Sequence, residues 1–258
     1  MRTEVVETAH LRVEVAVDAG PRVLRLSTPG GTNVFAETPD AGWDTVHGRP
    51  FRLLGGHRLW PAPECAPEEQ LPDDVPVDVR VHGATISVHD ETRRLELQLE
   101  GMRVHVRHVL TNAGDTTVRV AAWALTQLRP GGVARVPLRR DGGAEQLPDR
   151  KIVLWPYGSL GDPRLELADD RLCVHAKPAP GFFKVGCLNH TGRIEYELED
   201  ATFVKRFTPH PDAEHADLGC NVEVYVRDQF LELETLSPLR DVPPGGSIEH
   251  IEEWELHA

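Results

Sequence analysis

The segment GCNVEVYVRDQFLELETLSPL near the C-terminus alternates apolar and polar residues twice, with a break at residues 227–229. A period of two sends successive side chains to opposite faces of a β-strand, so the segment predicts a hairpin of two half-buried strands. A two-residue turn at the break places Glu223 opposite Glu234, and Tyr225 opposite Glu232. Like charges that face each other across a strand pair are destabilising. Carboxylates gathered on one sheet face therefore indicate bound polyol hydroxyls or acid–base chemistry.

The same alternation extends over most of the chain and predicts short strands joined by turns. The chain has 21 Pro and 22 Gly, a content that favours many turns over long helices. Besides the hairpin, the predicted strands are 11–17, 23–26, 77–81, 85–89, 94–100, 102–110, 117–127, 151–155, 172–176, 183–188, 193–199, 202–207 and 248–256.

Three segments depart from this pattern. Residues 43–74 and 128–147 are rich in Pro, Gly and charge, and they predict loops, the first of them a long functional loop or cleft edge. Residues 163–168 are the kind of short stretch that could be helical. We find no repeat and no linker, so residues 1–258 are expected to form a single all-β domain, a large antiparallel β-sandwich with little helix.

Composition excludes several classes of partner. The formal net charge of −13 argues against nucleic acid and anionic membranes. No phosphate-binding glycine loop, dinucleotide fingerprint or zinc-finger spacing is present. The N-terminus lacks the apolar core of a secretory signal, and the four cysteines form no paired motif, so we expect a cytoplasmic protein with reduced thiols. The acidic segment 210–217 is typical of a surface loop, and we expect neither metal nor cofactor.

Seven strings occur in order along nearly the whole chain: GGHRLWPAPE, WALTQLRPGG, WPYGSLGDPRL, FVKRF, GCNVEVY, LELETLSPL and PPGGSIEHIEEWEL. As a set they resemble an uncharacterised bacterial family with the galactose-mutarotase-like fold. This resemblance implies the β-supersandwich shared by aldose 1-epimerases and by carbohydrate-binding domains of glycosidases and polysaccharide lyases. It also implies a small-molecule carbohydrate as the partner.

Aldose 1-epimerases use a Glu as general base and a His as general acid. LETLSP followed by VPPGGSIEHIEEW is similar to their late strand, which implies that Glu234 is the base. The hairpin could instead correspond to an earlier strand pair of the epimerases. The stretch similar to their acid motif is AAWALTQL, in which Trp123 and Gln127 replace the acid His and its neighbours. His57 is therefore the candidate acid, and Glu232 a second catalytic carboxylate.

The remaining candidates would bind the ligand. Arg58 beside His57 suits a hydroxyl or carboxylate clamp, or alternatively a pair that ties a loop to the sheet. Glu64 is either a second carboxylate at the site or a loop anchor. The aromatic residues can present a face to a sugar ring, or simply fill the core. The full set of predicted ligand contacts is Arg58, Trp60, Glu64, Trp123, Gln127, Trp155, Tyr157, Lys205, Glu223 and Tyr225.

Basic residues inside strands need charged partners. Lys184, Lys205 and Arg206 are such residues, and one of the lysines is expected to offset the carboxylate repulsion. Lys205 is placed at the site.

Three functions remain open from the sequence. The first is an enzyme that acts at the anomeric or an adjacent centre of a sugar, with Glu234 as base. The second is a non-catalytic carbohydrate-binding or sensing protein that keeps the cleft but not the acid. The third is a sugar lyase or isomerase that uses Glu232 or Glu234 with His57.

Overall fold

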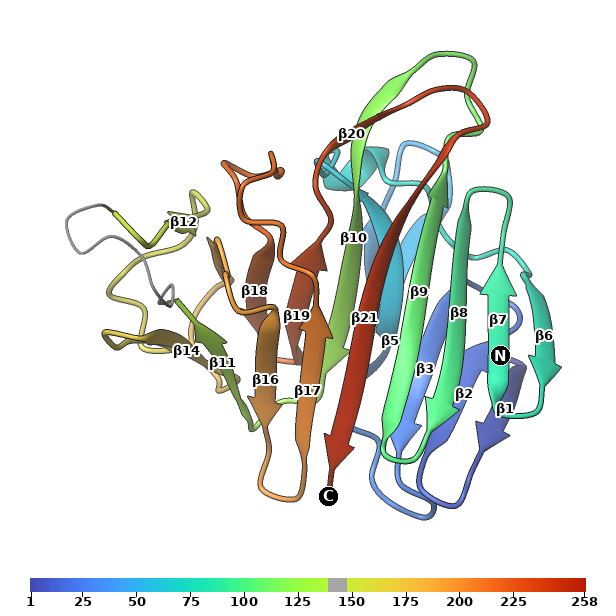
Figure 1. Cartoon of the computed structure of the whole chain (residues 1–258), viewed down its shortest axis with the longest axis horizontal. Coiled ribbons are helices and arrows are strands. Elements are labelled where there is room, and N and C mark those ends of the chain that lie inside the picture. Colours follow the sequence, from blue (N-terminus) through green and yellow to red (C-terminus); the bar gives the residue numbers. More distant parts are fainter. Residues whose placement is uncertain (139–147) are drawn as a thin grey trace.

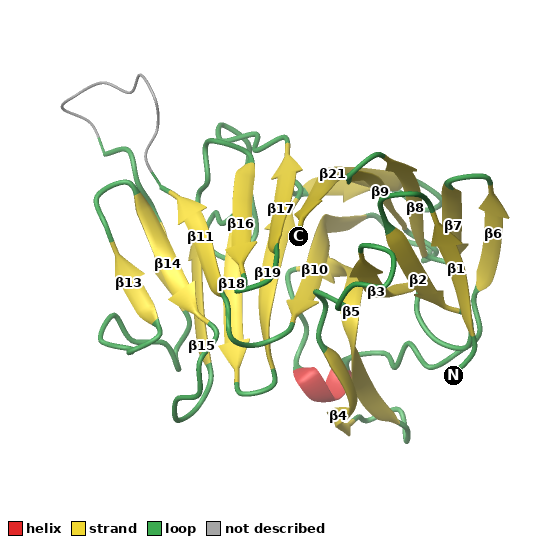
Figure 2. Cartoon of the chain, turned by 90° about the horizontal axis from the view of Figure 1, so that it is seen from below, coloured by secondary structure: helices red, strands yellow, loops and turns green. Residues whose placement is uncertain are grey.

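The computed structural model describes residues 1–138 and 148–258 of the chain. Two antiparallel β-sheets pack face to face, as Figures 1 and 2 show from two directions. Helix is limited, among the described residues, to the single 3₁₀ turn η1 (Pro67–Glu69). No helix there is long and apolar enough to cross a membrane. The all-β, antiparallel fold class predicted from the sequence is confirmed.

Over residues 1–138 and 148–258, the larger sheet has eleven strands in the order β1-β2-β3-β5-β10-β19-β18-β15-β12, with β4 paired to β5 and β20 paired to β10. Their bounds are β1 Thr3–Glu7, β2 Arg12–Ala16, β3 Arg22–Ser27, β4 Glu37–Asp44, β5 Pro50–Ala62, β10 Val118–Leu128, β12 Ile152–Leu154, β15 Phe183–Cys187, β18 Val222–Arg227, β19 Phe230–Leu236 and β20 Arg240–Val242.

In the described part of the chain, the smaller sheet has ten strands in the order β13-β14-β11-β16-β17-β21-β9-β8-β7-β6, and the closing strand β21 lies between β17 and β9 (Figure 1). Their bounds are β6 Asp78–His82, β7 Thr85–His89, β8 Arg93–Glu100, β9 Arg103–Thr111, β11 Val133–Pro137, β13 Leu165–Leu167, β14 Arg171–His175, β16 Arg193–Glu197, β17 Thr202–Phe207 and β21 Ser247–His257.

The main apolar core fills the space between the sheets. Val224 and Leu233 of the hairpin point into it from the larger sheet, and Phe203 and Trp254 meet them from the smaller one, all essentially without solvent exposure. A second apolar cluster lies on the outer face of the larger sheet, where Trp60, Trp123 and Phe230 contribute side chains from β5, β10 and β19. This outer face is also the face on which the hairpin places its carboxylates.

The prediction that residues 43–74 are irregular is wrong for β5, a 13-residue central strand. Its glycines gave the appearance of a loop, but they serve close packing. Gly55 and Gly56 have φ of 89° and 74°. A Cβ on Gly55 would lie 1.9 Å from the carbonyl oxygen of Ala36, just before β4, and one on Gly56 would lie 2.0 Å from that of Val23 on β3. Only glycine fits such a position, so the pair marks a tight strand crossing.

Two other predictions about irregular segments change. Residues 165–167, in the stretch that could have been helical, form strand β13. Strand β11 begins at Val133, within the predicted loop 128–147. Residues 139–147 of that loop lie outside the described residues.

Candidate functional site

The site lies on the outer face of the larger sheet, where β5, β10, β19 and β18 run side by side. In the hairpin, Glu223 pairs with Glu234 and Tyr225 with Glu232, which confirms the register predicted from the alternation. β10 continues the same face, because Gln127 pairs with Glu232. Three carboxylates from adjacent strand positions are thereby held on one surface.

Lys184 on β15 holds two of these carboxylates together. Its Nζ lies 2.7 Å from Glu223 and 3.0 Å from Glu234. The ammonium also lies 4.7 Å from the ring centres of both Trp123 and Trp155, so it is sandwiched between two aromatic faces. Burial by itself would lower the pKa of Lys184, but the two carboxylates outweigh it and hold the pKa well above its usual value. Lys184 is therefore the lysine that offsets the repulsion predicted from the sequence.

Glu234 is fixed through one of its two oxygens. Oε2 accepts hydrogen bonds from Trp123 Nε1 at 2.8 Å and from Lys184 Nζ. Oε1 is buried and finds no hydrogen-bond partner within the described part of the chain. Burial raises the pKa of Glu223 well above its usual range, Lys184 opposes that rise, and Glu234 adds to it. The facing pair thus combines Glu234, which has one oxygen without a hydrogen-bond partner in the described residues, with Glu223, whose carboxyl group retains its proton to higher pH.

Glu232 forms the second half of the site with Arg58 and Gln127. Gln127 Nε2 donates to Glu232 Oε1 at 2.8 Å, and the Arg58 guanidinium lies 3.7 Å from the same oxygen. That guanidinium stacks over Trp60 at 4.4 Å and lies 5.4 Å from the ring of Phe51. Burial and the neighbouring Glu234 raise the pKa of Glu232. Arg58 thus lies beside the carboxylates, and its role as a hydroxyl or carboxylate clamp stays a prediction.

An aromatic rim borders the site beyond β18. Tyr157 and Phe182 are about half exposed, and Phe182 lies 6.0 Å from Tyr225 and 6.5 Å from Tyr157 between ring centres. Burial raises the pKa of Tyr157 to about 12, so its hydroxyl stays protonated at neutral pH. Phe182 was not predicted. It directly precedes β15, and the signal available in the sequence was an aromatic residue next to the predicted strand 183–188.

A cavity of about 290 Å³ opens above Lys184. Trp123 and Trp155 form its aromatic walls, and Glu64 and Asp217 contribute carboxylates. The cavity is of the size of a small ligand site and combines aromatic faces with convergent polar groups. Asp217 was not singled out from the sequence as a ligand contact, because it belongs to the acidic segment that is typical of a surface loop.

No family model and no curated protein matches the sequence. Solved structures match over almost the whole chain. A provisionally named aldose 1-epimerase from Escherichia coli K12 has 13% identity and a TM-score of 0.56, with 99% of each chain covered. A provisionally named mutarotase from Salmonella typhimurium has 13% identity and a TM-score of 0.60, with 98% of this chain and 89% of that chain covered. A galactose mutarotase related enzyme from Lactobacillus acidophilus has 10% identity and a TM-score of 0.53, with 100% and 98% covered.

The chain has the galactose mutarotase-like fold. At these identities the likeness establishes the fold, whereas substrate and activity depend on the site itself.

Within the mutarotase-like fold, two predicted site residues lie between the two sheets and not on the outer face of the larger one. His57 precedes Arg58 on β5, so its side chain points inward, where Nδ1 contacts Thr126 at 2.8 Å and Nε2 contacts His108 at 2.8 Å. Lys205 comes from β17 of the smaller sheet and is also fully buried between the layers. Neither reaches the outer face, so the placement of His57 as acid and Lys205 as ligand contact is corrected.

Lys205 and His57 belong instead to a buried polar network between the sheets. Lys205 Nζ donates to Glu252 at 2.9 Å, and Trp254 Nε1 donates to the same carboxylate at 2.7 Å. Thr235 donates to it as well and accepts from His250 Nε2. Burial by itself would raise the pKa of Glu252, but Lys205 outweighs it and holds the pKa far below its usual value.

His57, His108 and Glu252 bring potential metal-ligand atoms within 4.8 Å of one another. His108 Nδ1 contacts the His250 carbonyl, which can only accept, so His108 Nδ1 carries the proton and its Nε2 is an acceptor. His57 Nε2 must then donate to His108, and its Nδ1 accepts from Thr126. Hydrogen bonds therefore occupy the ring nitrogens, and the cluster serves to join the two sheets.

The four buried histidines make stability depend on pH. Burial lowers the pKa of His57, His108 and His215, and lowers that of His250 to about 3. The unfolded chain takes up protons below about pH 6.5 that the folded protein does not, so stability is lost as the pH falls. Glu223 and Glu232 act in the opposite direction, because their raised pKa values give stability that is lost as the pH rises.

We expect the free energy of unfolding to fall by at most about 5 kcal/mol for each pH unit below 6.5, when four protons are counted. Urea unfolding at pH 7.0 and pH 5.5 measures this change. Glu232→Gln removes one opposing group and is expected to steepen the fall. Higher stability at pH 5.5 than at pH 7.0 would contradict the prediction.

Proposed function

We propose that the protein binds a small carbohydrate in the cavity above Lys184 and moves protons at its anomeric or an adjacent centre, with Glu234 as general base. The observation that carries this proposal is the geometry of Glu234. One oxygen is held by Trp123 and Lys184, and the other is buried without a hydrogen-bond partner in the described residues. A carboxylate held in this way is already oriented, and it would accept a proton from a sugar hydroxyl once Lys184 moves aside from its place between Glu234 and the cavity.

Opening of the ring needs a proton on the ring oxygen as the anomeric hydroxyl loses its own. Glu234 would accept the hydroxyl proton, the bond from C1 to the ring oxygen would break, and Lys184 would donate a proton to that oxygen. Glu223, 2.7 Å from Lys184, keeps its proton to higher pH and would return one to the amine. Closure on the other face of the aldehyde reverses these transfers.

A second candidate is a non-catalytic carbohydrate-binding protein. The observation that favours it is burial, because Glu223 and Glu234 have no solvent exposure and Lys184 lies between them and the cavity. Trp123, at the position implied for the acid His, provides a stacking face but no proton.

NMR exchange spectroscopy on a panel of aldoses separates the two candidates. Accelerated exchange between anomers supports the catalytic proposal. Saturable binding of a sugar without accelerated exchange supports the binding protein. Neither binding nor exchange with any aldose would overturn both.

Trp155→Ala is expected to weaken sugar binding about tenfold, because stacking on an aromatic face contributes roughly 1 kcal/mol beyond simple burial. Trp155 lines the cavity and is only half buried, so its replacement leaves the main core intact. Titration calorimetry gives the affinities. Trp155→Phe keeps a stacking face and is expected to bind within about threefold of wild type. Equal loss in both variants would show that the ring does not stack on the ligand.

A further inference from the structure

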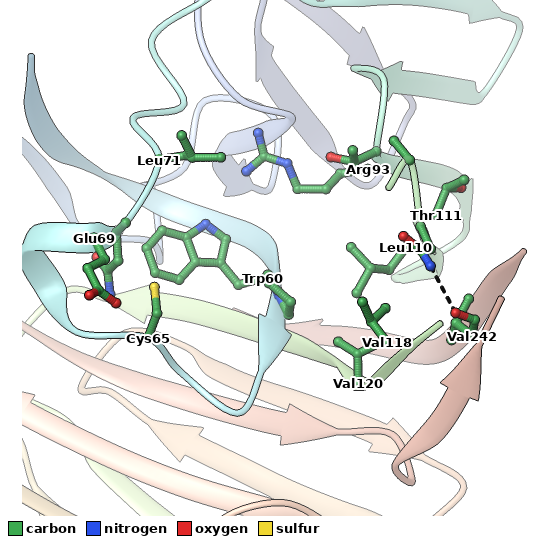
Figure 3. Close-up of a pocket in the computed structure, with 15 residues that line it drawn as sticks. Trp60, Cys65, Glu69, Leu71, Arg93, Leu110, Thr111, Val118, Val120 and Val242 are labelled. Atoms are coloured by element: carbon green, nitrogen blue, oxygen red, sulfur yellow. Dashed lines mark hydrogen bonds between the residues drawn. The ribbon is translucent and has the colours of Figure 1, made fainter. Parts of the chain in front are cut away.

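A second cavity, of about 360 Å³, lies at the end of the sandwich near the loop that follows β5. Figure 3 shows Leu110, Val118, Val120 and Val242 gathered to one side of the Trp60 indole. The volume falls at the lower end of the range for small-molecule sites, and apolar walls of this kind are their usual lining.

This cavity is distinct from the one above Lys184. Trp60 separates it from the carboxylates, because Arg58 stacks on the indole within the candidate site while the indole also lines the second cavity. The indole nitrogen of Trp60 makes no hydrogen bond to the other residues drawn in Figure 3. Cys65 contributes to the walls of both cavities, so they are neighbours that share part of one loop.

Gln70 lines the second cavity, and one of its polar atoms lacks a hydrogen-bond partner in the described residues. Gln70 is 3% exposed, and its Oε1 is buried without a hydrogen bond to any described residue. The orientation of the amide is fixed, because Nε2 donates to the Glu64 carboxylate at 2.8 Å and a flipped amide would set two acceptors against each other. A buried acceptor without a donor is unfavourable, and a ligand that donates a hydrogen bond would relieve it.

The charges around the cavity disfavour an anionic ligand. Arg93 also lines it, but its guanidinium already donates to Asp90 and to the Gly20 carbonyl. The Glu69 carboxylate contributes negative charge to the wall. The wall therefore offers a free acceptor and no free cation among its described residues.

We propose that this cavity is a binding site for a neutral, mainly apolar small molecule that carries one hydrogen-bond donor, such as a hydroxyl on a skeleton of one or two rings. The apolar walls bury the skeleton, and Gln70 Oε1 accepts from the hydroxyl. This site is independent of the carbohydrate proposal.

Titration calorimetry with 2-naphthol, naphthalene and 2-naphthoate tests the site on the full chain. We expect saturable binding of 2-naphthol at least about tenfold tighter than of naphthalene, and no binding of the naphthoate anion. Gln70→Met keeps the length of the side chain and removes the acceptor. It is expected to bring 2-naphthol and naphthalene within about twofold of each other.

Two variants fill the cavity from positions that tolerate change. Val118→Trp and Leu71→Trp alter side chains that are 39% and 70% exposed, and both are expected to abolish 2-naphthol binding. A thermal midpoint equal to that of the wild type shows that a variant is folded. If one of the two variants does not fold, the other still tests whether filling the cavity abolishes 2-naphthol binding. No saturable binding to wild type overturns the proposal. So does unchanged binding in a folded filled variant, or an unchanged preference for 2-naphthol in Gln70→Met.

Discussion

Lys205→Met is expected to lower the free energy of unfolding by about 3–5 kcal/mol, since it leaves a buried carboxylate without its counter-ion. The Lys205 ammonium is fully buried and contacts Glu252 at 2.9 Å. It also donates to the carbonyls of Leu233 at 3.1 Å and Ala124 at 3.3 Å, and so connects β17 to both β19 and β10. Urea unfolding at pH 7 measures the loss.

Arg206→Met is the matched control for Lys205→Met. Arg206 is the next residue on β17, faces solvent and pairs with Glu255 at 2.9 Å. An exposed ion pair contributes little, so this variant is expected to lose less than about 1 kcal/mol. Adding Glu252→Gln to Lys205→Met removes the uncompensated charge and is expected to restore part of the stability. Equal stability of the Lys205 and Arg206 variants would show that the buried pair does not stabilise the sandwich.

Glu234→Gln is expected to cut turnover about 10²–10⁴-fold while sugar affinity stays within about tenfold of wild type. The amide keeps the shape of the side chain and can still accept from Trp123 and Lys184, but it cannot take a proton from the sugar. NMR exchange or polarimetry on the aldose that binds best measures turnover. The control is Glu4→Gln, the same change at an exposed position on β1.

Two results would contradict the assignment of Glu234 as base. Wild-type turnover by Glu234→Gln would show that another group takes the proton, and would favour an earlier strand pair of the epimerases as the counterpart of the hairpin. Loss of sugar binding in Glu234→Gln with full retention in Glu4→Gln would assign Glu234 to ligand binding.

Local periodicity sufficed where the strand pattern was unbroken. The hairpin of β18 and β19 has the register that its alternation predicts, because a one-residue slip would send Val224 and Leu233 to the outer face. Alternation alone therefore suffices to group the carboxylates on that face.

The sequence was less informative about β5 and about the partners of buried charges. The glycine pair made the segment of β5 look like a loop in the sequence. Once β5 is known to be a strand, alternation alone places the side chains of His57 and Arg58 on opposite faces of the sheet. The choice between Lys184 and Lys205 depends on which sheet each strand joins. That is a property of long-range pairing, and local sequence does not encode it.

The alternation of β5, β10 and β19 also shapes how the protein can be re-engineered. Neighbouring positions on these strands have different roles. Arg58, Gln127 and Glu234 face outward at the candidate site, whereas the residues next to them in sequence face the space between the sheets. A combinatorial library can randomise the outward positions while every inward side chain is held constant. Ligand preference can then diversify without disturbing the contacts that join the two layers.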